Sequence, residues 1–109
     1  MKPNKTFTDY LKPDEPDYVQ ERIVCGINAL IETLKLPVTK LTDNISTSII
    51  SIKLREITGD NFNLRTSDGQ AIQLHFAIIR ICPDEETADR VMELSEEKFL
   101  HYKKTRSFI

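Results

Sequence analysis

Glycine is scarce in this sequence, which contains only Gly26, Gly59 and Gly69. None of the three is spaced to form a glycine-rich phosphate loop, and no serine lies between two glycines as in a nucleophile elbow. A long apolar run is also missing. Because a helix needs about 20 consecutive apolar residues to cross a bilayer, we expect no membrane-spanning segment and no membrane partner.

Cysteine and histidine are equally rare, with two residues of each. His75 and His101 fall in different predicted elements, and no cysteine or histidine pair has the spacing of a metal site. Cys25 and Cys82 each stand among apolar residues, which favours reduced thiols in a core. Neither is expected within reach of a histidine base. We therefore expect no enzyme activity, no metal and no cofactor.

Charge of one sign does not dominate: the sequence has 15 Lys and Arg and 17 Asp and Glu, which gives a net charge of −2. A dedicated nucleic-acid-binding domain usually carries a clear basic excess, so this balance disfavours one. The first six residues contain lysines but no apolar stretch. We therefore expect no secretion signal and a cytoplasmic location.

Two parts of the chain show helical spacing of apolar residues. The first predicted helix runs from about Asp14 to Leu36, and Pro37 ends it. Its apolar stripe consists of Val19, Ile23, Ile27, Leu30, Ile31 and Leu34. The last helix follows Asp84, with acidic residues in its first turn and basic residues in its last. Its expected buried stripe is Ala88, Val91, Met92, Ser95, Phe99 and Tyr102.

Between residues 45 and 82 the apolar residues alternate with polar ones, and a two-residue period predicts β-strands. The expected inward residues of the three strands are Ile50, Ile52 and Leu54, then Phe62 and Leu64, then Ile72, Leu74, Phe76 and Ile78.

Two turns are predicted between these strands, at Thr58-Gly59-Asp60-Asn61 and at Ser67-Asp68-Gly69-Gln70. The second is a hairpin turn, because Asp-Gly favours positive φ angles. The predicted fold is a two-layer α+β domain over residues 14–109, preceded by an arm of residues 1–13. A helix, a three-stranded antiparallel meander and a helix follow in order, with both helices on one face of the sheet.

The polar residues of the predicted strands would share the other face of the sheet. The candidate binding residues on that face are Lys53, Arg55, Asn63, Arg65, Gln73 and His75. Three permanent cations and a histidine make a locally basic patch, which suits phosphates or an acidic protein surface. The exposed aromatic residues that stack RNA bases on other sheets are missing here.

These observations favour a small non-enzymatic protein-binding domain, such as a regulator, an inhibitor or immunity-type protein, or a chaperone-like adaptor. Binding would use the sheet face, the open edge of the first strand or a dimer surface. A homodimer is an option if the apolar end groups, Phe7 with Tyr10 and Leu11 or Phe108 with Ile109, are exchanged between copies. The alternative is a nucleic-acid or anionic-ligand binder that uses the basic sheet face and loses affinity as salt rises.

Overall fold

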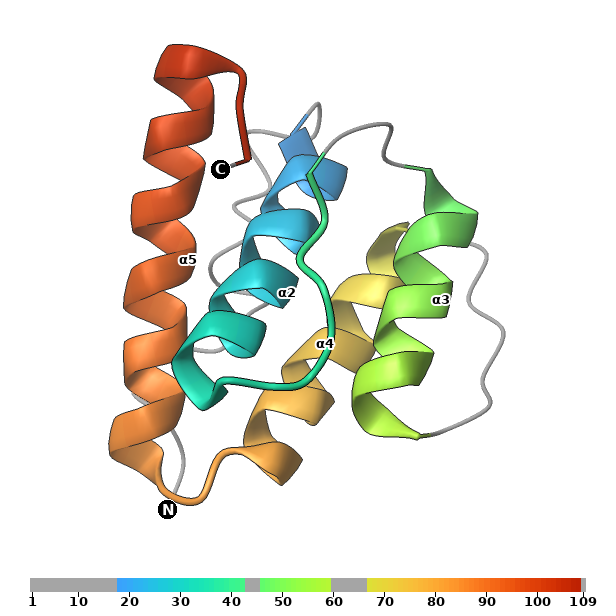
Figure 1. Cartoon of the computed structure of the whole chain (residues 1–109), viewed down its shortest axis with the longest axis vertical. Coiled ribbons are helices and arrows are strands. Elements are labelled where there is room, and N and C mark those ends of the chain that lie inside the picture. The colour runs from blue at the N-terminus through green and yellow to red at the C-terminus, as the bar shows by residue number, and fades with distance from the viewer. Residues whose placement is uncertain (1–17, 43–45, 60–66, 109) are drawn as a thin grey trace.

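The computed structural model describes residues 18–42, 46–59 and 67–108, and over these residues it contains helices and no strand. The helices are α2 (Val19–Leu34), α3 (Thr47–Thr58), α4 (Ser67–Ile81) and α5 (Glu85–Thr105). In Figure 1, α2 lies at the centre, α5 runs beside it, and α3 stands at the other edge of the molecule, where it packs on α4. The predicted α+β fold with a three-stranded sheet is therefore wrong, and the described chain is a helical, bundle-like globule.

The strand prediction fails because of how apolar residues are distributed around α4. Residues two positions apart share a face of a strand, but they lie about 200° apart around a helix. Leu74 and Ile78 are buried, at 0% and 1% exposure, whereas Ile72 and Phe76 point outward at 45% and 56%. α4 thus has apolar residues on two opposite faces. Taken together, the residues of the two faces occupy every second position from Ile72 to Ile78, which is the pattern of a strand.

α3 repeats this arrangement over a shorter length. Ile50 and Leu54 are fully buried, while Ile52 between them is exposed. The helix begins after Ser46, whose Oγ accepts a hydrogen bond from the Ile49 N–H at 3.2 Å. It ends at Gly59, which has a φ of 75° that favours glycine. The first predicted turn therefore correctly marks the end of an element, although that element is a helix.

The second predicted turn is wrong, because residues 67–70 form the first turn of α4. The middle strand prediction, with Phe62 and Leu64, lies outside the described residues. So do the arm of residues 1–13 and Ile109.

The two predicted terminal helices are confirmed as α2 and α5 over their described residues, but α2 ends at Leu34 and not at the predicted Leu36. Asp84 caps α5, since its Oδ1 accepts a hydrogen bond from the Thr87 N–H at 2.7 Å. The expected α5 stripe is buried from Ala88 to Phe99, and Tyr102 is half-buried. Phe108 folds back onto the body, where its ring stacks on Tyr102 with centroids 4.4 Å apart.

The middle of α2 is enclosed on every side, because residues 22–31 are all buried. An amphipathic surface helix shows one apolar stripe, so a helix buried all round occupies the core. Arg22 is among these residues. Its guanidinium carbon lies 3.8 Å from the centre of the Phe99 ring, and its Nη1 pairs with Glu96 Oε2 at 3.3 Å. These contacts fasten the start of α2 to α5.

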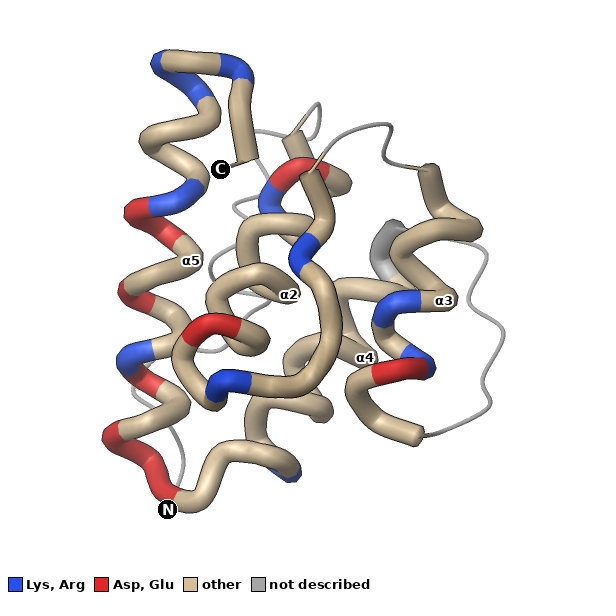
Figure 2. The backbone as a smooth tube through the Cα atoms, viewed as in Figure 1, with Lys and Arg blue, Asp and Glu red and all other residues tan. Residues whose placement is uncertain are grey.

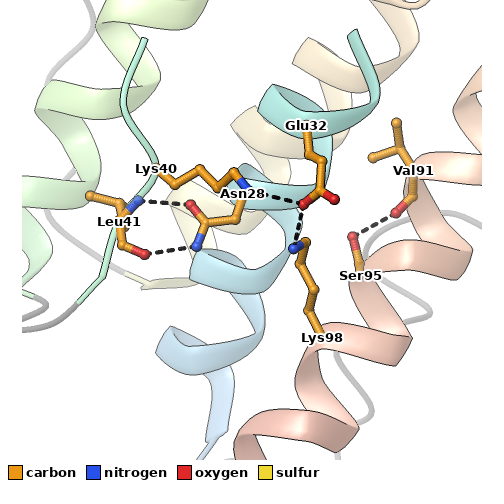
Figure 3. Close-up of polar contacts among 7 residues, drawn as sticks. All are labelled: Asn28, Glu32, Lys40, Leu41, Val91, Ser95 and Lys98. Carbon is orange, nitrogen blue, oxygen red and sulfur yellow. Dashed lines mark hydrogen bonds and ion pairs between the residues drawn. The ribbon is translucent and has the colours of Figure 1, made fainter. Parts of the chain in front are cut away.

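The segment that follows α2 turns back across it. Lys35 adopts a left-handed conformation (φ 53°, ψ 47°), and the Leu36 N–H donates to the Ile31 carbonyl at 3.0 Å, which is the pattern of a Schellman motif. Six residues later the backbone of Leu41 exchanges two hydrogen bonds with the buried Asn28 side chain, each 2.8 Å long (Figure 3). Residues 35–41 are thereby held against α2, where Leu41 belongs to the hydrophobic core.

None of the described helices combines the length and the apolar character needed to span a membrane.

Candidate functional site

The side of α4 that faces away from α2 carries three large apolar side chains in one line. Ile72, Phe76 and Ile79 are 45%, 56% and 45% exposed, and they are spaced four and three residues apart. Residues with this spacing are neighbours on one helix surface. We call these three residues the α4 outer face. No described element covers them.

α3 adds two exposed apolar residues, Ile49 and Ile52. α3 and α4 are joined by the side chain of Gln70, which is fully buried. Its Nε2 donates to the Thr47 carbonyl at 2.7 Å and contacts the Ser51 Oγ at 2.9 Å. These two hydrogen bonds tie the first turn of α4 to α3, which packs against it.

The α4 outer face is free of charge. From Gly69 to Ile79 the sequence contains no lysine, arginine, aspartate or glutamate, and Arg80 follows directly after Ile79. Figure 2 shows the contrast: red and blue alternate along α5, whereas the described part of α4 is tan over almost its whole length. The surface is therefore suited to apolar contact and not to an ionic ligand.

A single exposed apolar residue does not indicate a binding site, because much of any protein surface is apolar. Leu100 on α5 is an example. It is 51% exposed, but its helix neighbours Glu97 and Lys104 are charged. A line of three such residues with no charge between them is different, since contiguous apolar patches mark interaction sites.

The proposed basic sheet face does not exist in the structure, because the described residues contain no sheet. Lys53 is buried in α3, where its Nζ donates to Thr39 Oγ1 at 3.2 Å and pairs with Glu56 at 3.5 Å. It links the segment after α2 to α3, so it contributes to the packing of the fold. Arg55 is exposed on the same helix.

The other candidate binding residues are scattered. Gln73 and His75 are half-buried on α4, and helix geometry places them on either side of the α4 outer face. Asn63 and Arg65 lie outside the described residues. The four described residues are therefore not brought onto one flat surface, and a binding role for any of the six stays a prediction.

The thiols are not arranged as nucleophiles. Burial raises the pKa of Cys25 to about 12 and that of Cys82 to about 11, so both are protonated near neutral pH. A protonated, buried thiol is a poor nucleophile and a poor metal ligand. In the described part of the chain no group of three or more His, Cys, Asp or Glu residues is placed to hold a metal ion.

The sequence interpretation did not identify the α4 outer face because it assigned Ile72 and Phe76 to a buried sheet surface. A usable signal was present in the missing charges between Gly69 and Ile79. A strand or helix with one solvated face normally carries charges on that face. Their absence from both faces indicates a second contact surface.

Comparison of the chain with protein-family models, with curated proteins and with solved structures gave no match.

Proposed function

We propose that this chain is a non-enzymatic protein-binding domain, of the regulator, inhibitor or adaptor kind, and that the α4 outer face is its binding surface. The observation that carries the proposal is the line of Ile72, Phe76 and Ile79, each about half exposed on a helix that is already anchored by its opposite face. Full burial of such a side chain contributes about 1.5–3 kcal/mol, so half burial of three leaves about 3 kcal/mol available to a partner.

The chemistry of the face defines the kind of partner. The line from Ile72 to Ile79 contains no lysine, arginine, aspartate or glutamate, and the exposed Arg80 borders it only at one end. The face itself complements an apolar, uncharged protein surface such as one face of a helix. Binding should therefore be insensitive to salt. A nucleic-acid ligand, in contrast, would lose affinity steeply with rising salt.

Site-specific photocrosslinking in cells tests this proposal. A benzophenone amino acid at position 76 should form covalent adducts with protein, because the side chain lies at the centre of the α4 outer face. The matched control is the same probe at Leu100, which is equally exposed but lies between charged residues. Adducts at position 76 that exceed those at position 100, in cells and also in lysates photolysed at high salt, support the proposal. Equal yields at the two positions would contradict it.

A cytoplasmic location is the companion proposal. Cys25 and Cys82 are both free thiols, and a reducing compartment keeps thiols in this form. Detection of the tagged chain in a cell fraction outside the cytoplasm would refute it.

A further inference from the structure

We propose that the partner on the α4 outer face is a second copy of this chain, with the two α4 helices packed face to face about a two-fold axis near Phe76. This inference rests on the proposed function, because it uses the same surface. The proposed partner is thus another copy of the chain and not a different protein.

The first support is the arrangement of the apolar side chains along the helix. Ile72 lies four residues before Phe76, and Ile79 lies three residues after it. In an antiparallel pair of such helices, Ile72 of one copy faces Ile79 of the other, and the two Phe76 rings meet near the axis. A two-fold interface requires a surface that is complementary to itself, and this spacing provides one.

The second support is electrostatic. Two identical surfaces present like charges to each other wherever a charge lies near the axis, and such contacts are costly. The stretch from Gly69 to Ile79 has no charged residue, so two copies meet without this repulsion. The net charge of the whole chain, −2, adds little opposition. A charged partner would gain nothing from the same surface.

The size of the surface sets the expected affinity. α4 has 15 residues, which corresponds to a helix about 22 Å long and about 10 Å wide. One pair of such helix faces buries less than the about 800 Å² per partner of a standard interface. The dimer is therefore a weak one, which forms only at high concentrations of the chain.

Sedimentation of the full chain between about 5 µM and about 1 mM tests the dimer directly. The wild-type chain should pass from monomer to dimer over this range. Phe76→Ser should raise the dissociation constant at least tenfold, and Ile79→Ser should have the same effect. Leu100→Ser, at an equally exposed position on α5, should leave it within twofold. Circular dichroism verifies folding, which is retained because both α4 substitutions are on the outer face.

A crosslink adds geometric evidence. Phe76→Cys should give a disulfide-linked dimer under mild oxidation, since position 76 lies near the two-fold axis. Leu100→Cys should remain monomeric. The native Cys25 and Cys82 do not interfere because both are buried.

The outcomes separate the two proposals. A chain that is monomeric at about 1 mM, and that forms no disulfide at position 76, overturns the dimer. If adducts of the photocrosslinking probe then contain a different protein, the protein-binding proposal stands and only its partner was wrong. If position 76 also gives no adduct above the Leu100 control, both proposals fail.

Discussion

Asn28→Ala should strongly destabilise the fold, because the side chain of Asn28 holds the segment after α2 in place. Asn28 is fully buried and exchanges two 2.8 Å hydrogen bonds with the backbone of Leu41, which is itself 6% exposed. A buried backbone group left without a partner costs about 1–3 kcal/mol. The substitution orphans one N–H and one C=O, so we expect a loss of about 3 kcal/mol, or about 12 °C in melting temperature.

Thermal and urea unfolding monitored by circular dichroism measure this loss. Lys40→Ala is the matched control, since Lys40 adjoins Leu41 and pairs only at the surface with Glu32, at 3.2 Å. An exposed ion pair is worth at most about 1 kcal/mol. If Asn28→Ala were no more destabilising than Lys40→Ala, the two buried hydrogen bonds would not hold this segment.

Asn28→Asp gives an independent check on the same hydrogen bonds. The introduced carboxylate cannot donate to the Leu41 carbonyl, and burial of its charge raises its pKa in the folded state. The destabilisation relative to wild type should therefore be large at neutral pH and should shrink as the pH falls through that raised pKa, where the group becomes a donor again. A difference that does not depend on pH would contradict this assignment.

Three further predictions concern the C-terminal end of α2 and the two buried cysteines. Lys35→Gly should stabilise the protein by about 0.5–1 kcal/mol in urea unfolding, because Lys35 has a φ of 53° that glycine adopts without strain; Lys35→Ala should bring no such gain. The hydrogen bond from Lys98 lowers the pKa of Glu32, so this carboxylate stabilises the fold above its unfolded pKa, and the stabilisation is lost as the pH falls through the lowered folded value. Wild type should thus exceed Glu32→Gln by at most about 1 kcal/mol at pH 7, and a gap that persists at about pH 2 would refute the assignment. Cys25 and Cys82 should be unreactive toward a disulfide reagent in the native protein at about pH 8 and fully reactive in denaturant; fast native labelling would show that they are not buried.

The sequence was sufficient to predict the helices at both ends of the described chain. Their apolar residues lie in a single stripe or fill the core, and Asp84 marks the start of α5 through capping. Pro37 indicated the end of the first helix only approximately, because α2 already ends at Leu34 with Lys35 in a left-handed conformation. These are local effects that depend on a few residues, so they can be read without knowing the partner elements. The full enclosure of α2 was not predictable in this way, because burial of Asn28 depends on a backbone segment 13 residues away.

The middle of the chain was not predictable from periodicity for a physical reason. A helix with one apolar face shows a period of 3.6, but α4 has an inward face with Leu74 and Ile78 and an outward face with Ile72 and Phe76. Along the sequence, residues of the two faces follow one another at every second position, so the pattern alternates as in a strand. Isoleucine also favours strands. The residues that misled the fold prediction are thus the ones that form the candidate binding surface. A departure from simple patterning of this kind is expected at functional sites.

The enclosure of α2 also has a consequence for biosynthesis. α2 is made early, but its Arg22 finds Glu96 and Phe99 only after more than 70 further residues have been added. Closing so long a loop precedes the contacts that reward it, so α2 cannot settle into its final position before α5 has been synthesised. Until α5 has left the ribosome, the apolar side chains of α2 that pack against α5 in the folded protein stay uncovered on that side.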